Sequence, residues 1–263
     1  MSGVRWRTAV FEGCRGLARG LDVVARTLVY AGAGLLTREQ LREAITRRWN
    51  RFGHSRDFVL SGLDPSEAAF YHRFLERDDD ILVVGSGSGR DLIALLREGY
   101  RADGLEPAAP AAERARAMVA EAGLRSDIRV GSMETTPPDR TYDVYIFSGL
   151  CYGYIPERRV RVAALAAARA RLAPGGRILL SYVPRTTPVR LAPRLIAAAA
   201  ARLAASGRRP EATDVMSLEL GGLHFEHQFL PGEIEAEAHA AGLHVSFHEI
   251  ADGGGIAALV ISP

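Results

Sequence analysis

Three alternating glycines, Gly85, Gly87 and Gly89, follow a run of four apolar residues at 81–84. The apolar run predicts a short buried strand, and residues 91–97 have the pattern of a helix that begins directly after the glycines. Glycine adopts backbone angles that other residues avoid, so such a turn can bring backbone N–H groups and a helix N-terminus close to a ligand. This arrangement is typical of nucleotide binding. Arg90 stands where a dinucleotide fingerprint would have glycine or alanine.

A carboxylate follows the glycine turn at a chemically useful distance. Glu106 lies seventeen residues after Gly89, at the end of a second predicted strand. Its two oxygens can accept hydrogen bonds from two adjacent ribose hydroxyls. The turn and this acid together favour a ligand that contains a nucleoside.

The surrounding elements alternate regularly. Strands are expected near 81–85, 101–106, 128–132, 143–148 and 177–183, with helices over 90–98, 108–122 and 156–172. This order predicts a parallel sheet with helices on both faces. After Pro184 the pattern changes to an alanine-rich helix at 189–206, a strand or hairpin at 213–229, a helix at 231–241 and two strands at 243–250 and 256–261. The short glycine-rich link between these last strands predicts an antiparallel hairpin.

Composition describes an ordinary globular chain of 263 residues with a formal net charge of +2, long enough to bury a full core. All 33 basic residues are arginine, which excludes lysine Schiff-base and P-loop chemistry. Cys14 and Cys151 lack metal-ligand spacing, so we expect no metal. One disulfide between them is the alternative to the reduced, cytoplasmic protein that we expect. No apolar run is long enough to span a membrane, and the N-terminus lacks the form of a signal peptide.

The basic charge is concentrated at the N-terminus. Residues 1–60 contain eleven arginines against five acids, and apolar residues recur there at helical spacing. The pattern predicts a helical cap with a solvated arginine face; the alternative is a surface helix for anionic lipid or for an acidic partner. The aromatic residues Trp49, Phe52, His54 and Phe58 follow. They could close over a ligand or dock the cap on the core.

Taken together, these pieces resemble the class I, Rossmann-like S-adenosylmethionine-dependent methyltransferases. The resemblance is carried by ILVVGSGSGRD, GYRADGLEP, IRVGSME, YDVYIFSGLCYGYIP, LAPGG before ILLSY, and HQFLPGEIEAEAHAAGL. It implies an α/β fold with a seven-stranded, mostly parallel sheet, an antiparallel last strand and helices on both faces. We expect a helical N-terminal cap at 1–63 and a methyltransferase domain at 64–263, with a substrate-lid insertion after the fifth strand at about 184–230.

The same resemblance implies S-adenosyl-L-methionine as the cofactor and assigns its contacts. The glycine turn would lie under the methionine part, Glu106 would hold the ribose, and Ser148 would face the sulfonium. The predicted contacts are Gly85, Ser86, Gly87, Gly89, Glu106, Ser132, Met133 and Ser148. Valine at position 83 departs from the family, which often has an acid there. Asp91 could partly replace that acid, or could simply favour the helix N-terminus by its charge.

Methyl transfer from a sulfonium is an in-line displacement that needs orientation, exclusion of water and, for some acceptors, removal of a proton. Tyr152 and Tyr154 could line the acceptor pocket or pack a loop. His227 is the candidate base, with a packing histidine as the alternative. On a strand, His224 would point to the opposite face, and Glu226 on that face is a weaker alternative base.

The sequence therefore predicts methyl transfer to an oxygen or nitrogen of a small molecule. Outside residues 1–60 the chain is net acidic, so a nucleic-acid partner is not expected. Contact of the basic N-terminal helices with a membrane surface stays an alternative, and the oligomeric state is open. Two rival functions are a non-catalytic binding protein of the same fold, favoured by Val83 and Ser132, and a nucleotide-dependent oxidoreductase, opposed by Arg90 and the terminal hairpin.

Overall fold

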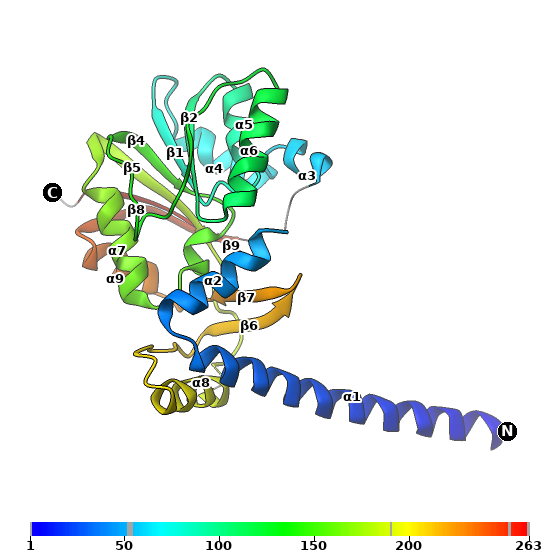
Figure 1. The fold of residues 1–263 in the computed structure, drawn as a ribbon. Coiled ribbons are helices and arrows are strands. Elements are labelled where there is room, and N and C mark those ends of the chain that lie inside the picture. Colours follow the sequence, from blue (N-terminus) through cyan, green and yellow to red (C-terminus); the bar gives the residue numbers. More distant parts are fainter. Residues whose placement is uncertain (1, 52–54, 190, 252–253, 262–263) are drawn as a thin grey trace.

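A seven-stranded sheet forms the centre of the protein. The structure is a computed structural model that describes residues 2–51, 55–189, 191–251 and 254–261. The strand order is β3-β2-β1-β4-β5-β9-β8, and β9 runs antiparallel to both of its neighbours (Figure 1). The strands are β1 (Asp80–Val84), β2 (Arg101–Glu106), β3 (Ile128–Val130), β4 (Tyr142–Phe147), β5 (Leu172–Tyr182), β8 (Leu243–Ala251) and β9 (Gly254–Ile261). The expected fold class is confirmed.

Helices cover both faces of the sheet, and the residues of β1 alternate between two apolar clusters. Ile81 and Val83 pack with side chains of α4 (Pro65–Phe74), α5 (Arg90–Arg97) and α6 (Ala109–Glu121). Leu82 and Val84 belong to a second cluster with side chains of α7 (Arg158–Arg169) and α9 (Glu233–Ala240). A strand covered on both faces reads as a continuous apolar run. Val83 is fully buried in the first of these clusters and does not line the cavity described below.

Strand β5 begins earlier than the sequence predicts. Tyr142 pairs with Leu172, and the pairing then shifts so that Val144 pairs with Arg177. The Pro-Gly-Gly segment at 174–176 is therefore a bulge within β5 rather than the turn before it. A bulge adds residues to one strand without ending the ladder, so β5 extends to before the start near residue 177 that the sequence predicts.

The N-terminal segment is helical, as predicted. It contains α1 (Ser2–Leu35), α2 (Arg38–Trp49) and α3 (Arg56–Leu60). Thr37 and Gln40 form the predicted capping box at the start of α2. Most of α1 projects away from the rest of the molecule (Figure 1).

The segment after β5 folds against these helices. It contains α8 (Leu191–Leu203) and a hairpin of β6 (Asp214–Glu219) and β7 (Gly222–His227). The end of α1 packs on α8, and α2 packs on β7. A third apolar cluster joins them, made of Ala33, Leu41, Ile45, Met216, Leu223 and Phe225. Two segments far apart in the sequence thus share a core beside the main sheet.

Candidate active site

A cavity of about 440 Å³ opens at the carboxyl ends of β1, β2 and β4. This is the edge of an open α/β sheet where ligands usually bind. The glycine turn, the end of β2, the segment at 131–134 and the segment at 148–151 line one part of the cavity. Side chains of α2, α3 and the 3₁₀ helix η1 (Cys151–Tyr154) line the other part.

The glycine turn provides a surface without side chains. Gly87 has φ 54°, and a Cβ atom added there would meet nothing within 4 Å, so the cavity comes directly to the backbone. At Gly85, with φ 68°, the added Cβ would lie 2.7 Å from Cβ of Cys151. Gly89 precedes α5 with φ 96° and packs against Ala115 rather than lining the cavity. Gly85 and Gly87 therefore border the ligand space, whereas Gly89 shapes the turn.

Two serine hydroxyls in this turn are buried without a partner in the described part of the chain. The Oγ atoms of Ser86 and Ser88 have no hydrogen-bond partner among the described residues, although both serines line the cavity. Buried polar atoms are nearly always paired. Because both oxygens have almost no accessible surface, they would have to rotate toward the cavity to contact a ligand there.

Glu106 is buried at the end of β2, and its carboxylate is held by the backbone. Gly87 N–H donates to Oε2 at 2.9 Å, and Ala108 N–H donates to Oε1 at 2.8 Å. Burial raises the pKa of Glu106 to about 7, although these two hydrogen bonds act to lower it. The acid is therefore oriented toward the glycine turn and lines the cavity, as its predicted contact with a ribose requires.

Three charged side chains surround the start of α5. Arg90 donates to Asp91 Oδ1 at 2.6 Å and to Glu67 Oε2 at 2.6 Å. Ser148 Oγ donates to Asp91 Oδ2 at 2.5 Å, which ties the end of β4 to the glycine turn. All four residues line the cavity. Two carboxylates thus lie beside the glycine turn, although position 83 is valine.

The segment after β3, which the family resemblance assigns to the adenine, lines the cavity. Ser132 and Met133 both border it. The hydroxyls of Ser132 and Thr135 are hydrogen-bonded at 2.8 Å, and Met133 is almost fully buried. Met133 provides an apolar surface and Ser132 a small polar group beside it, a combination that suits the face and edge of a purine.

The opposite wall comes from α2 and η1. The side chains of Arg42, Ile45, Thr46 and Trp49 recur at the spacing of one helix face and line the cavity. The rings of Trp49 and Tyr154 are 4.9 Å apart. Sequence reasoning missed the first three, although their spacing after the Thr37 capping box was a usable signal.

Among the aromatic residues that follow α2, Phe58 also lines the cavity. Its guanidinium neighbour Arg90 lies 5.7 Å from the ring. Phe52 and His54 lie outside the described residues. Trp49 and Phe58 therefore face the cavity, as in the first of the two roles considered for these aromatic residues, closing over a ligand.

The two candidate tyrosines, Tyr152 and Tyr154, have different surroundings. Tyr154 lines the cavity, and burial raises its pKa to about 12. Tyr152 is fully buried and does not line the cavity. Its hydroxyl donates to Glu237 Oε2 at 2.6 Å, and its ring stacks on Phe229. Tyr152 therefore packs the strand-to-helix connection, whereas Tyr154 forms part of the wall.

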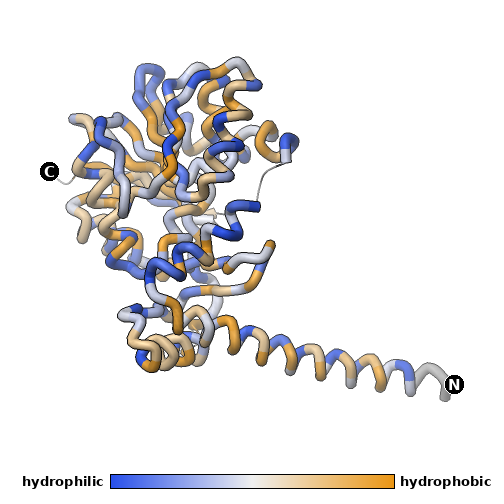
Figure 2. Tube along the Cα trace, in the orientation of Figure 1, coloured by the Kyte–Doolittle hydropathy of each residue, from blue (hydrophilic) through white to orange (hydrophobic). Residues whose placement is uncertain are grey.

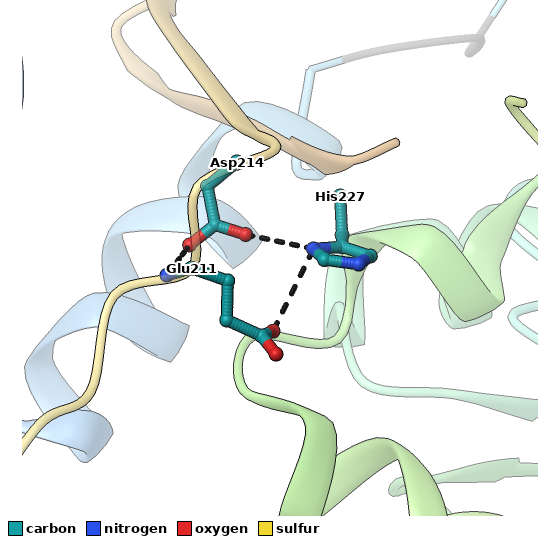
Figure 3. Close-up of side chains that lie close together, drawn as sticks. All are labelled: Glu211, Asp214 and His227. Atoms are coloured by element: carbon teal, nitrogen blue, oxygen red, sulfur yellow. Dashed lines mark hydrogen bonds and ion pairs between the residues drawn. The ribbon is translucent and has the colours of Figure 1, made fainter. Parts of the chain in front are cut away.

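His227 lies outside the cavity, in a buried group of charged side chains (Figure 3). Its Nδ1 is 2.9 Å from Asp214 Oδ1, and its Nε2 is 3.0 Å from Glu233 Oε1. Burial acts to lower the pKa of His227, but the hydrogen bonds to Asp214 and Glu233 outweigh it and raise the pKa to about 9. The imidazole is therefore protonated near neutral pH and donates from both nitrogens, an arrangement that does not favour the predicted base role.

The other two candidates on β7 lie closer to the cavity wall or to solvent. His224 contacts Tyr154, with ring centroids 6.1 Å apart, and burial lowers its pKa. Glu226 accepts a hydrogen bond from Gln228 at 2.9 Å. Neither lines the cavity, so the histidine that faces its wall is His224 rather than His227.

The charged group around His227 joins the hairpin to the main sheet. Arg161 on α7 is fully buried and donates to Glu237 at 2.7 Å and to Glu211 at 2.8 Å. Glu211, Asp214 and His227 place ligand atoms within 4.8 Å of one another, a grouping that could hold a metal ion. A metal ion there would have to displace the proton on Nδ1 of His227. In the described residues the charged side chains form a buried ion-pair network.

None of the helices in the described part of the chain combines the length and the apolar character needed to span a bilayer.

Comparison with known proteins identifies the central part of the chain. Residues 81–176 match a family whose description is "Methyltransferase domain". They contain the glycine turn, Glu106, Ser132, Met133 and Ser148. No curated protein sequence matches the chain.

Solved structures share its fold. The DhpI–SAH complex matches with a TM-score of 0.59 and 19% identity over 85% of this chain and 98% of that chain. The glycopeptide N-methyltransferase MtfA complexed with S-adenosyl-L-methionine matches with a TM-score of 0.56 and 16% identity, covering 75% of this chain and 87% of that chain. The mitomycin 7-O-methyltransferase MmcR matches with a TM-score of 0.50 and 19% identity, covering 84% and 54%. The chain therefore carries a methyltransferase domain at residues 81–176, in a fold that it shares with solved methyltransferase structures.

Proposed function

We propose that the protein transfers the methyl group of S-adenosylmethionine to an oxygen or nitrogen atom of a small molecule. The observation that carries this proposal is one continuous cavity, lined at one end by Gly87 and Glu106 and at the other by Trp49 and Tyr154. Its volume lies in the usual range for small-molecule sites. The names of MtfA and MmcR describe transfer to nitrogen and to oxygen, respectively, which supports either acceptor atom here.

The cofactor would be held mainly by the ends of the strands. In this proposal Glu106 accepts from the ribose hydroxyls, and Ser132 and Met133 border the adenine. Ser86 and Ser88 donate to the methionine part, and the carboxylates of Asp91 and Glu67 attract its amino group. These two acids would replace the acid that the family often has at the position of Val83.

The cofactor supplies an activated methyl group, so the chain's own residues need only hold the acceptor in line and exclude water. Trp49, Tyr154 and Ile45 present apolar surface to the acceptor side. His227 is assigned an anchoring role, since its imidazolium is held between two carboxylates outside the cavity. Catalysis would then rest on positioning rather than on a dedicated base from β7.

We also propose that residues 1–63 and the insertion at about 184–230 act together as the substrate lid of the domain at 64–263. The apolar cluster shared by α1, α2, β6 and β7 supports this division. Arg48 on α2 pairs with Glu219 on β6 at 2.8 Å. The hairpin thereby supports the helix that lines the acceptor side.

Production of S-adenosylhomocysteine, measured with a library of small hydroxyl and amine acceptors, tests the function. Turnover is expected with at least one small acceptor, and Gly87→Val should abolish it. Turnover only with RNA or with protein substrates, and with no small molecule, would contradict the proposal. A cavity variant such as Trp49→Ala should alter the preference among acceptors.

A further inference from the structure

The free part of α1 presents a large surface that the rest of the described chain does not cover. All side chains from Trp6 to Leu28 are exposed, and apolar positions alternate with polar ones along the helix (Figure 2). The protein exposes 13560 Å², whereas a compact monomer of 28.4 kDa would expose about 11,200 Å². A stable dimer needs about 600–1,000 Å² from each partner. The excess surface is sufficient for such an interface.

The apolar residues of α1 follow a heptad pattern. Alternate steps of four and three residues connect Val10, Cys14, Leu17, Leu21, Val24 and Leu28, which we call the seam, and the same steps continue to Ala31 and Leu35. The large side chains of the seam are 55–67% exposed. Their mean spacing is about 3.5 residues, as in a coiled coil.

This spacing favours a helical partner over a flat surface. On a straight helix a 3.5-residue stripe drifts by about 20° per heptad, so it stays in contact over the length of α1 only with a helix that supercoils around it. A lipid surface would instead select the 3.6-residue period of the helix itself. Small residues flank the seam, and Cβ atoms added at Gly13 or Gly20 would meet nothing within 4 Å. Two backbones can therefore approach closely.

The charges of α1 lie away from the seam and are partly neutralised within the helix. Arg15 pairs with Glu12, and Arg26 pairs with Asp22 at 2.9 Å. Neither pair occupies a seam position. The seam is therefore free of charge along its length, which suits burial against another apolar stripe.

The base of α1 is oriented so that a second molecule can reach the seam. Tyr30 O–H donates to the carbonyl of Asp214 at 3.0 Å, and Ala33 is buried in the cluster with Leu41. Leu28 and Leu35 remain 65% and 52% exposed. At 100° per residue, these two leucines point away from the side that Tyr30 and Ala33 attach to the body. The seam therefore faces away from the molecule's own body.

We propose that α1 pairs along this seam with α1 of a second copy of the chain, as a coiled coil. Self-complementarity makes a second copy the partner that offers the matching stripe in the same period. Because α1 leads through Leu36 and Thr37 into α2, the pairing also fixes the helix that lines the acceptor side of the cavity.

Size-exclusion chromatography with light scattering on the full chain tests the proposal. The mass should be at least twice 28.4 kDa, and Val24→Glu should reduce it to that of one chain. Val23→Glu is the matched control, since Val23 is 63% exposed and adjacent but off the seam. Both side chains are exposed, so neither change should disturb the body, as circular dichroism would verify.

Two outcomes would overturn the pairing. One is a wild-type mass of a single chain at tens of micromolar protein. The other is equal dissociation by Val23→Glu and Val24→Glu. A monomer that pellets with phosphatidylglycerol vesicles, and loses this on Val24→Glu, would instead assign the seam to lipid.

Discussion

The two ends of the cavity are built in different ways. The cofactor end consists mainly of short segments that directly follow β1, β2, β3 and β4. The acceptor end consists of bulky side chains such as Arg42, Trp49 and Tyr154, carried by helices that the distant β6–β7 hairpin supports. The difference indicates that the cofactor end is fixed by the fold. The acceptor end, in contrast, can change its side chains without altering the sheet.

The largest effect is expected at the cofactor end. Gly87→Val should weaken binding of S-adenosylhomocysteine at least about a thousandfold, or about 4 kcal/mol, because the side chain would enter the cavity. Calorimetric titration measures this. Gly123→Val is the control: Gly123 also has positive φ and open space around it, but it does not line the cavity. Equal loss of affinity in both variants would show backbone strain rather than a blocked site.

The free energy of unfolding should depend on pH through His227, in the charged group that joins the β6–β7 hairpin to the main sheet. The pKa of His227 is raised from 6.5 to about 9 in the folded protein. The stabilisation of the folded protein by protonated His227 is therefore fully present below pH 6.5. It is lost as the pH rises through 9, which lowers the free energy of unfolding by about 3 kcal/mol. Urea unfolding between pH 6 and 10 should show this loss in the wild type and not in His227→Gln.

His224→Gln is the control for that experiment. Burial lowers the pKa of His224, so above pH 6.5 this residue is mostly neutral in both the folded and the unfolded protein. The loss of stability at high pH should therefore persist in the His224→Gln variant. A His227→Gln protein with unchanged stability but lost turnover would return His227 to the role of base.

A smaller effect is expected at Glu106. Glu106→Ala should weaken cofactor binding by about 1–3 kcal/mol, because two ribose hydroxyls would lose their acceptor. Glu134→Ala, which removes another carboxyl of the cavity lining, should have less effect. Unchanged affinity in the Glu106 variant would show that the ribose lies elsewhere.

The smallest change tests the acceptor end alone. Trp49→Ala should raise KM for the acceptor by about tenfold, with cofactor affinity unchanged, because this side chain lines the acceptor side of the cavity and does not belong to the glycine turn. Trp6→Ala on the free part of α1 is the matched tryptophan control. If Trp49→Ala weakened the cofactor as strongly as the acceptor, the two ends would not be separable.

The sequence predicted the strands and the turn that form the cofactor end because their determinants are local. Gly85, Gly87 and Glu106 each lie within a few residues of a strand end, and the alternation of strands and helices places those ends at one edge of the sheet. The apolar run before the turn and the terminal hairpin were sufficient to predict the sheet and its antiparallel strand. The cofactor contacts themselves stay a prediction, although most of the predicted residues line one cavity.

The acceptor end could not be predicted in the same way. Arg42, Ile45 and Thr46 line the cavity only because α2 packs on β7. The sequence of α2 alone does not indicate this packing. The alternation of side chains along a strand correctly predicted that His224 and His227 lie on opposite faces of β7. Which face met the cavity wall depended on how the hairpin packs, and that information lies in long-range contacts.

In its proposed contact with the ribose, the buried carboxyl of Glu106 would link cofactor exchange to protons in solution. With a pKa of about 7, it is about half protonated at neutral pH before the cofactor binds. Ribose hydroxyls that donate to it would favour the carboxylate, so each binding event would release about half a proton. The product retains the ribose, and its departure would take that proton up again. The heat of binding would then depend on the buffer, and mild acidification would promote release of the product.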